Sequence, residues 1–366
     1  MTNNLSEHYY ALVMAGGGGT RLWPLSRQAR PKQMLRLIGD QTMFQMSVRR
    51  LQPLLAPDHV YVITGQDQVA RLHAQTPEIP LENFIIEPFG RDSGPAAGLG
   101  NLVIHERDPQ AIVATLASDH YIGDTARFRE MLVAAASLAE EEMFVTLGVE
   151  ASRPAIQFGY IRRGESLGKR NGFECFRAVD FTEKPNLERA TQFVASGLYS
   201  WNSGMFIWKT ARVLAEFERQ QPDIHRLLDQ IRAHLGAEDF TARITPLWEQ
   251  MPRISVDYAI MEHAPAIAVI PADIQWSDIG SWDMLMHLLD CDTAGNVVVG
   301  DAPELIQIDS ARTLVASDQR LIVTIGVDDL VVVETEDVIL VCHRDRSQEV
   351  REVVRRLREQ NADHYL

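Results

Sequence analysis

The feature that most constrains the fold of this chain is a run of four glycines, residues 16–19, that follows a short apolar segment. The apolar residues 10–14 predict a buried strand, and the glycines predict a tight turn directly after it. Because glycine lacks a Cβ, backbone N–H groups in such a turn can closely approach phosphate oxygens or the edge of a base. Arg21 and Lys32 follow soon after and would bring positive charge to the same place. The stretch therefore predicts a binding site for a polyphosphate.

Two better-known phosphate-binding motifs do not match this stretch. A P-loop requires Lys-Ser or Lys-Thr after its last glycine, and neither follows here. A dinucleotide-binding fingerprint requires glycine at its sixth position, which is Arg21 when counted from Gly16. A glycine turn without any ligand is the remaining alternative. It is disfavoured because an exposed turn rarely needs four glycines followed by clustered arginine and lysine.

Composition narrows the classes of partner. A length of 366 residues predicts roughly two or three domains, each able to bury its own core. The formal net charge is −15, and the basic residues are interspersed among acidic ones. Such a chain is a poor match for nucleic acid or for an anionic membrane as its main partner. A phosphate site must then be a local positive pocket.

The cysteines and the N-terminus bear on location. The three cysteines are odd in number and far apart, so they form neither a disulfide framework nor a zinc motif. The first eight residues are polar and have no apolar signal core. No apolar run approaches the ~20 residues of a membrane span. The sequence therefore predicts a cytoplasmic protein.

The spacing of apolar segments predicts an α/β fold. Strand-like segments alternate with helical ones over residues 9–145, which predicts a doubly wound, mostly parallel, Rossmann-like sheet. Ligands of such sheets bind beyond the carboxyl ends of the strands, where the glycine turn falls. The predicted strands are 10–14, 59–64, 83–87, 111–117 and 143–148, and the predicted helices include 43–55, 94–105 and 128–141. Shorter strands and longer helices are predicted for about 150–290.

The last quarter of the chain has a different pattern. Six short β-segments between residues 296 and 343 are separated by Gly, Asp and Ser, which predicts a compact β-structure or short solenoid. Apolar residues at helical spacing then predict an amphipathic helix over 346–359. We therefore expect two domains: 1–290, with halves 1–150 and 151–290, and a small module over 291–366.

The motifs carry a resemblance to a known family. Residues 16–27, together with Pro-Lys-Gln at 31–33, resemble the opening motif of the sugar-1-phosphate nucleotidyltransferases. Trp-Pro-Leu-Ser-Arg at 23–27 is similar to the bacterial mannose-1-phosphate guanylyltransferase branch. Related motifs continue to about residue 345. The resemblance implies transfer of GMP from GTP to α-D-mannose 1-phosphate, with Mg²⁺ as cofactor and GDP-mannose and pyrophosphate as products.

The resemblance also implies a nucleotide site at the glycine turn and after two later strands. The segment from Glu87 to Ala97 is similar to a Gly-Arg-Asn-Thr-Ala-Pro segment that lines the nucleotide pocket of the family. Here Asp, Ser and Gly replace Asn, Thr and Ala, and Asp92 or Ser93 could equally be a helix N-cap. The residues expected to bind the nucleotide are Ala15, Gly16, Gly17, Gly18, Gly19, Thr20, Glu87, Arg91, Asp92, Ser93 and Ser118.

Two aspartates are the expected magnesium ligands. Asp119 closes an apolar run, and a carboxylate just past a buried strand can bind Mg²⁺ while leaving positions for phosphate and water. A capping or turn aspartate is the alternative. The family implies Asp278, within the Trp-flanked motif 276–282, as the second ligand. The fold must bring the two together, because they are far apart in sequence. His120 is expected to be structural.

The sugar phosphate is expected to bind in the second half of the first domain. Glu183 and Lys184 end an extended run and could bind sugar hydroxyls and phosphate, or form a surface ion pair of little energetic value. The resemblance favours binding, since this Glu-Lys-Pro motif binds the sugar phosphate in the family. Ser255 predicts a helix N-cap, which leaves Asp257 open to either role. The expected residues are Gly159, Glu183, Lys184, Asn202, Ser203 and Asp257.

The predicted reaction uses Arg21, Lys32 and Lys184 as catalytic cations and needs no general base. Within the same class, another nucleoside triphosphate or hexose phosphate is the alternative. A non-catalytic subunit that binds nucleotide sugars is an alternative of another class, and a simple GTPase would lack its P-loop lysine. Related enzymes carry a left-handed β-helix-like module used for dimerisation, so a homodimer through residues 291–366 is expected. No cupin-like isomerase pattern follows, which predicts a single activity.

Overall fold

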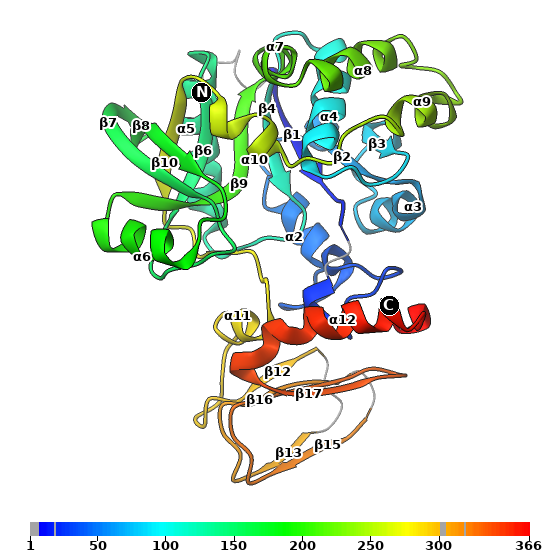
Figure 1. The fold of residues 1–366 in the computed structure, drawn as a ribbon, viewed down its shortest axis with the longest axis vertical. Coiled ribbons are helices and arrows are strands. Elements are labelled where there is room, and N and C mark those ends of the chain that lie inside the picture. Colours follow the sequence, from blue (N-terminus) through cyan, green and yellow to red (C-terminus); the bar gives the residue numbers. More distant parts are fainter. Residues whose placement is uncertain (1–6, 18–19, 301–304, 318–319) are drawn as a thin grey trace. The chain divides into compact units, whose positions relative to one another are not determined.

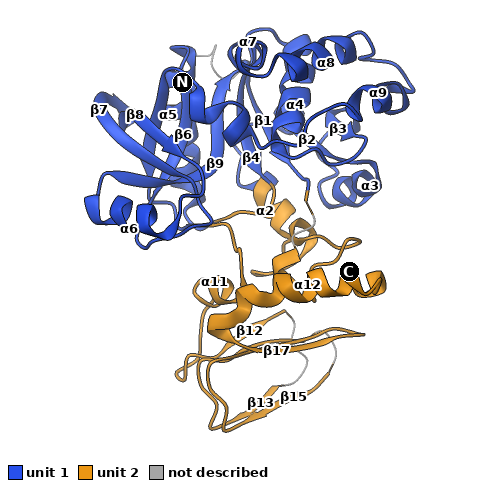
Figure 2. Ribbon diagram, in the orientation of Figure 1, with its two compact units in different colours: residues 1–16, 48–117, 122–276 blue, residues 17–47, 118–121, 277–366 orange. Residues whose placement is uncertain are grey.

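The computed structural model describes residues 7–17, 20–300, 305–317 and 320–366. These fall into two compact units, which Figure 2 colours separately. Unit 1 comprises residues 1–16, 48–117 and 122–276, and unit 2 comprises residues 17–47, 118–121 and 277–366. The predicted division at residue 290, like the cytoplasmic location, stays a prediction. None of the helices in the described part of the chain has the length and apolar character needed to cross a membrane.

The described residues of unit 1 form a nine-stranded sheet with the order β3-β2-β1-β4-β9-β6-β10-β8-β7 (Figure 1). Strands β1 to β4 pair in parallel, as do β6 and β10, while β9 is inserted antiparallel between β4 and β6. All strands of this sheet except β8 and β9 therefore run in one direction, which confirms the predicted mostly parallel sheet. The strands are β1 (Tyr9–Met14), β2 (Val60–Gly65), β3 (Phe84–Glu87), β4 (Ile112–Ala117), β6 (Phe144–Glu150), β7 (Tyr160–Arg170), β8 (Phe173–Thr182), β9 (Tyr199–Lys209) and β10 (Ile267–Ala272).

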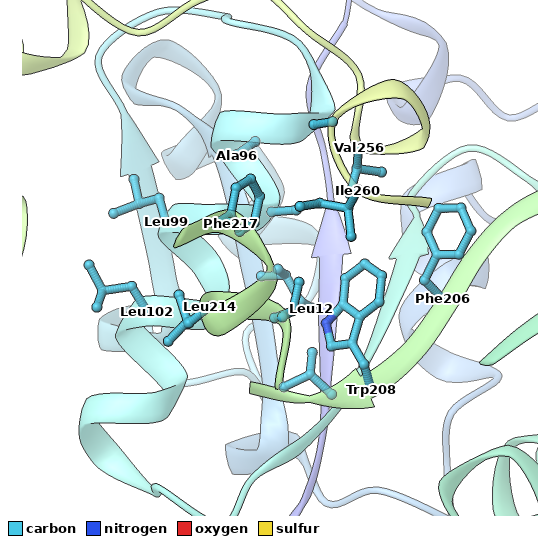
Figure 3. Packing of buried hydrophobic residues seen from close by; sticks show 14 of the residues in the cluster. Leu12, Ala96, Leu99, Leu102, Phe206, Trp208, Leu214, Phe217, Val256 and Ile260 are labelled. Atoms are coloured by element: carbon cyan, nitrogen blue, oxygen red, sulfur yellow. The ribbon is translucent and has the colours of Figure 1, made fainter. Parts of the chain in front are cut away.

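Helices cover both faces of this sheet. On one face, Leu12 of β1 and Trp208 of β9 belong to a core with Phe217 and other side chains of the helices α4 (Ser93–Arg107), α7 (Thr210–Gln220) and α8 (Pro222–Arg232) (Figure 3). On the other face, the Tyr9 hydroxyl donates to the carbonyl of Leu132 in α5 (Thr125–Glu140) at 3.0 Å. Residues an odd number apart in a strand point to opposite faces, so Tyr9 and Leu12 contact different layers. The doubly wound arrangement is thus confirmed.

The segment from 150 to 276 differs from its prediction. Strands β7, β8 and β9 have 11, 10 and 11 residues, and none of β1 to β4 exceeds six. The prediction of shorter strands over about 150–290 is therefore wrong for these three strands, whereas β10 has six residues and β11 (Trp276–Ser277) has two. The register of β7 against β8 shifts at three places, and much of this hairpin is exposed, so no apolar alternation marks it. The helices are also shorter than α4 and α5; they include α6 (Leu187–Ser196), α9 (Phe240–Trp248) and α10 (Val256–Ala259), and α3 (Gln66–Gln75) lies outside the predicted helices.

Unit 2 contains the small β-module. Its strands β12 (Val297–Val299), β14 (Leu314–Ser317) and β16 (Leu330–Glu334) pair in parallel, and β17 (Ile339–His343) adds antiparallel to β16. A second parallel pair joins β13 (Leu305–Ile308) to β15 (Ile322–Ile325). Hydrogen bonds link residues 17 apart on successive turns, as from Thr313 to Asn296. This confirms the predicted β-helix-like module and gives it a 17-residue repeat.

One hydrophobic core joins this module to the segment after the glycine turn. Leu22 and Trp23 belong to it, as do α11 (Trp282–Met286) and the buried valines of the C-terminal helix α12 (Val350–Glu359). Helix α12 starts four residues later than predicted, because residues 344–349 form a 3-10 helix first. The shared core includes Leu22, Trp23, Leu35, Leu37, Met43, Ile279, Trp282, Leu285, Val297, Leu314, Val331, Val350 and Val354.

The chain's last residues hold the same segment by hydrogen bonds. The indole Nε1 of Trp23 and the guanidinium of Arg27 both donate to the carbonyl of Tyr365, at 2.7 and 2.6 Å. The backbone N–H of Gln28 donates to the Leu366 carbonyl at 2.7 Å. The predicted phosphate-binding segment is therefore held as part of the C-terminal unit.

Candidate functional site

A pocket of about 300 Å³ in unit 2 gathers the predicted phosphate and metal residues. Arg21 reaches it from the 3-10 helix η1 (Thr20–Leu22), and Lys32 from the 3-10 helix η2 (Lys32–Met34). Asp119 and Asp278 line the same pocket, although 158 residues of chain separate them (278 − 119 − 1). The structure thus brings the two aspartates together, as the predicted metal site requires. The lining residues are Thr20, Arg21, Lys32, Asp119, His120, Asp278, Ile279 and Gly280.

Lys32 links the two aspartates. Its ammonium is 3.0 Å from Asp119 Oδ2 and also donates to the backbone carbonyl of Asp278. The residue is 5% exposed, and a buried lysine needs such partners because its charge has left water. Arg21 is also near Asp278, with Nη1 3.9 Å from Oδ2. Asp278 Oδ1 is buried without a hydrogen-bond donor.

The local electrostatics keep Asp119 ionised. Burial by itself would raise the pKa of Asp119, but the charges of Lys32 and His120 outweigh it and lower the pKa. An ionised carboxylate is a ligand for hard cations such as Mg²⁺. No group of three or more His, Cys, Asp or Glu side chains suited to a metal lies among the described residues.

The first part of the glycine turn meets a buried carboxyl group in unit 1. A Cβ placed on Gly16 would lie 3.4 Å from Glu87 Oε1, and Glu87 Oε2 is buried without a donor. The two residues come together because β1 and β3 are parallel and end at the same edge of the sheet. Burial raises the pKa of Glu87 to about 7. Ala15 is buried in the sheet, whereas Gly18 and Gly19 lie outside the described residues.

The predicted nucleotide residues just before α4 form hydrogen bonds within unit 1. The Arg91 guanidinium donates to the Glu249 carbonyl at 2.6 Å and lies 4.8 Å from the ring centre of Phe89. Asp92 has φ 70° and caps α4 by accepting from the backbone N–H of Ser93. The capping interpretation of Asp92 is therefore correct. Capping leaves its nucleotide contact, and those of Arg91 and Ser93, as predictions.

Unit 1 also gathers most of the predicted sugar-phosphate residues. The Asn202 amide donates to Asp257 Oδ1 at 2.7 Å, and the Lys184 ammonium contacts Glu183 Oε1. A Cβ on Gly159 would collide with Glu183 Oε2 and lie 3.2 Å from the Asn202 Cβ. The resulting cluster has a glycine floor with an amide, two carboxylates and one ammonium around it. Glu183 Oε2 is buried without a donor.

The charges of this cluster are coupled. Burial and the nearby Glu183 raise the pKa of Asp257 to about 6, although Asn202 and Lys184 oppose the shift. Burial would lower the pKa of Lys184, but its bond to Glu183 outweighs this and raises the pKa. The ammonium therefore stays charged and half of its side chain is exposed, at 51%. Such a group can bind an incoming phosphate.

Ser203 points away from this cluster, and Ser118 is buried. The Ser203 hydroxyl donates to the Leu147 carbonyl at 2.7 Å, on the face of β9 opposite to its neighbour Asn202. Ser118 is buried at 1% exposure beside Asp119. Gly280, which sequence reasoning missed, has its Cβ position 3.0 Å from Asp278 Oδ2 and 3.2 Å from Arg21 Nη1. Its place two residues after a predicted metal ligand was the available signal.

A family comparison gives this geometry a context. The family model described as nucleotidyl transferase matches residues 10–294, well over half of the chain. The chain belongs to the nucleotidyl transferase family. A second model, described as a MannoseP isomerase/GMP-like beta-helix domain, matches residues 303–357, a range that contains β13 to β17 and most of α12.

Relatives of this nucleotidyl transferase are similar over nearly its whole length. Mannose-1-phosphate guanylyltransferase of Escherichia coli (strain K12) is 38% identical over 361 residues, or 95% of this chain and 73% of that protein. The alginate biosynthesis protein AlgA of Pseudomonas aeruginosa is 36% identical over 94% of this chain and 71% of that protein. A crystal structure titled mannose-1-phosphate geranyltransferase, from Thermus thermophilus, has a TM-score of 0.86 and 35% identity, covering 96% of this chain and 99% of the other.

The raised pKa of Glu87 predicts a pH-dependent stability difference between this nucleotidyl transferase and its Glu87→Gln variant. The folded-state pKa is about 7 against an ordinary value of 4.5, so the wild type loses stability as pH rises from about 4.5 through 7. The glutamine amide does not ionise. The free energy of unfolding of Glu87→Gln should therefore rise by about 1–3 kcal/mol relative to that of the wild type between pH 5 and pH 8. Urea unfolding at the two pH values measures this.

The matched control is Glu82→Gln, which changes an exposed carboxyl group next to the same strand. Its stability should follow that of the wild type at both pH values. If the free energy of unfolding of Glu87→Gln changes with pH in the same way as that of the wild type from pH 5 to pH 8, the pKa of Glu87 is not raised by folding.

Proposed function

We propose that this nucleotidyl transferase transfers GMP from GTP to α-D-mannose 1-phosphate and releases pyrophosphate. One observation carries the proposal: Glu87, Glu183 and Asp278 each have a buried carboxylate oxygen without a donor. Buried polar groups are normally paired, so these oxygens mark where a substrate or a metal ion supplies the partner. Relatives named mannose-1-phosphate guanylyltransferase support the choice of substrates.

Glu87 is the residue that selects the base. The Watson–Crick edge of guanine presents two neighbouring donors, N1–H and the N2 amino group, and a carboxylate accepts from both in its ionised form. Two such donors favour the ionised form of Glu87 and oppose the burial that raises its pKa to about 7. Uracil and thymine present a single N3–H between two carbonyls, and adenine presents one amino group beside an acceptor. A carboxylate at the glycine turn therefore favours guanine, and its buried oxygen would be left unpaired by the other bases.

The cluster in unit 1 binds the sugar phosphate. Glu183, Asn202 and Asp257 supply acceptors and a donor for sugar hydroxyls, which need both. The half-exposed ammonium of Lys184 binds the phosphate. Gly159 leaves the space that a Cβ would take from the Glu183 carboxylate.

Asp119 and Asp278 fit a magnesium ion. Both offer hard oxygen ligands, Asp119 is held ionised, and Asp278 Oδ1 has no donor of its own. Mg²⁺ typically keeps waters and substrate phosphates as its remaining ligands, which suits a site with two carboxylates. When bound, Mg²⁺ supplies charge neutralisation for the triphosphate.

The protein's task in the reaction is positioning and charge balance. An oxygen of the sugar phosphate forms a new bond to the α-phosphorus of GTP. The bond from that phosphorus to the oxygen bridging to the β-phosphorus breaks, and pyrophosphate leaves with its electron pair. The attacking oxygen is anionic at neutral pH, so no proton has to be removed. Arg21 and Lys32 stabilise the charge on the triphosphate and on the leaving group.

The proposal predicts a defined substrate preference and a way to change it. Turnover of GTP, UTP, dTTP and ATP with mannose 1-phosphate and with glucose 1-phosphate should be greatest for GTP with mannose 1-phosphate. Glu87→Gln should lower kcat/KM for GTP by about a hundredfold or more, because an amide cannot accept both guanine donors. Its use of UTP should rise relative to GTP, since an amide matches an N3–H beside a carbonyl.

The matched control is again Glu82→Gln, which should keep the wild-type preference. GTP binding without pyrophosphate release in the wild type would contradict the proposal and favour a nucleotide-sugar-binding subunit. A wild type that prefers UTP or dTTP would contradict the assignment of the base.

Loss of a pocket carboxylate should reduce turnover strongly. Asp278→Ala removes a metal ligand and the partner of Arg21, so kcat should fall by about 10²–10³-fold and more Mg²⁺ should be needed for half-maximal rate. Asp290→Ala, at an exposed aspartate of the same unit, is the control and should be close to wild type. Pyrophosphate release over a magnesium titration measures both effects. Turnover within a few-fold of wild type would refute the role of Asp278.

We also propose that two copies associate through the outer face of β13 and β15. Ile306 pairs in register with Val323, and Ile308 with Ile325, and these four side chains are 47%, 47%, 48% and 63% exposed. Four apolar side chains in adjacent pairs form a contiguous patch of the kind that marks a protein–protein interface. Their neighbours Leu305 and Gln307 point to the inner side of the coil.

The proposed homodimer can be tested by charging this patch. The double variant Ile308→Glu, Ile325→Glu should be a monomer in light scattering at concentrations where the wild type is a dimer, because burying two carboxylates opposes association. Leu187→Glu, at a 61% exposed leucine of α6, is the control and should remain dimeric. A double variant with the wild-type mass would exclude this face.

A further inference from the structure

The backbone turns at Ile279, which lines the pocket of unit 2 between Asp278 and Gly280. Its φ of 41° lies in the left-handed region, and Ile279 is the only β-branched residue there in the described part of the chain. This conformation is unfavourable for a residue with a Cβ, because the Cβ comes too close to the following carbonyl oxygen. The preference of isoleucine itself therefore does not explain the turn.

Burial and one hydrogen bond hold the turn in place. The Ile279 side chain is 1% exposed and belongs to the core that the β-module shares with Leu22. Its backbone N–H donates to the hydroxyl of Ser277 at 3.1 Å, and Ser277 is itself buried. A change to a right-handed or extended backbone would take the isoleucine out of a closely packed site. The core thus stabilises a conformation that the residue alone disfavours.

The turn sets the place of the Asp278 carboxylate. In an extended chain, Cα atoms two residues apart are separated by about 7 Å. Here the Cβ position of Gly280 is only 3.0 and 3.3 Å from the two carboxylate oxygens of Asp278, so the carboxylate folds back over Gly280. Asp278 Oδ2 then lies 3.9 Å from Arg21 Nη1, and the Asp278 carbonyl accepts from Lys32. One turn therefore orients both the side chain and the carbonyl of a pocket residue.

We infer that Ile279 is a positioning residue, whose buried side chain imposes the left-handed turn that holds the Asp278 carboxylate in the pocket. Strained backbone conformations persist where the surrounding structure enforces them, and they cluster at functional sites. What the carboxylate does there rests on the proposed function. Its placement by Ile279 is a property of the protein alone.

Glycine and alanine at position 279 separate this role from a packing role. Both remove the buried side chain, but glycine adopts the left-handed conformation readily and alanine does not. Packing alone would favour alanine, which is the larger of the two. We therefore expect kcat to fall by about tenfold in Ile279→Gly and by about a hundredfold or more in Ile279→Ala. The Mg²⁺ concentration for half-maximal rate should rise in the same order, and Ile279→Val should stay close to wild type.

Leu314→Ala is the matched control for loss of packing. Leu314 is fully buried in the same core and is not among the residues that line the pocket. Its variant should have a lower unfolding midpoint and a magnesium requirement within about twofold of wild type, at a temperature where every variant is folded. An equal rise in Leu314→Ala, or an alanine variant at position 279 as active as the glycine variant, would overturn the inference. If Ile279→Ala does not fold, wild-type turnover in Ile279→Gly would overturn it as well.

Crystal structures of the wild type and of Ile279→Ala provide a readout that needs no activity. In the alanine variant the Asp278 carboxylate should leave its position over Gly280, and the hydrogen bond from Lys32 to the Asp278 carbonyl should be lost. An Asp278 that keeps its wild-type position in this variant would contradict a positioning role. If the wild type forms no GDP-mannose, the proposed function fails by itself, and these two structures still decide whether Ile279 positions Asp278.

Discussion

The site in unit 2 depends on a hydrophobic core that is shared between the start and the end of the chain. Leu22 is fully buried next to Arg21, and Ile279 is 1% exposed next to Asp278. Both belong to the core formed with the β-module and α12. A side chain buried in a packed core has little freedom, and so its polar neighbour along the backbone is held in place as well. The core therefore fixes the positions of charges that would otherwise lie on mobile loops.

Electrostatics adds a constraint that packing alone would not impose. Lys32 is almost completely buried, and its two oxygen partners come from Asp119 and from the backbone of Asp278. Removing the Asp119 carboxylate would leave this buried charge uncompensated, which costs several kcal/mol. Lys32 and Asp119 therefore balance each other's charge at the pocket.

Strands and helices were predicted best from the sequence where the same faces stay buried along the whole element. The apolar runs were sufficient to predict β1 to β4, because those strands are buried on both faces. The helical spacing of apolar residues was sufficient to predict α12, because this helix buries one face. The β7–β8 hairpin was not predicted, since register shifts and exposure remove the alternation of apolar and polar residues that marks a strand. The 17-residue repeat of the β-module was also not predicted. Residues at equivalent positions of successive turns, such as Asn296 and Thr313, differ in type and are joined by a hydrogen bond that the sequence does not reveal. That Asp119 and Asp278 meet depends on long-range packing, which no local pattern contains.

The departure of this chain from the family motif before α4 has a local structural reason. The motif has alanine where this chain has Gly94, whose backbone N–H donates to the Ile254 carbonyl at 2.9 Å. A Cβ at this position would lie 2.6 Å from that oxygen, closer than contacts between real atoms allow. The Ser93 hydroxyl accepts from the N–H of Val256 at 3.0 Å and reinforces the same approach. Because α10 begins at Val256 and contains Asp257, Ser93 and Gly94 hold the start of α4 against the segment that leads into Asp257. A side chain larger than glycine at position 94 would therefore force these two segments of unit 1 apart.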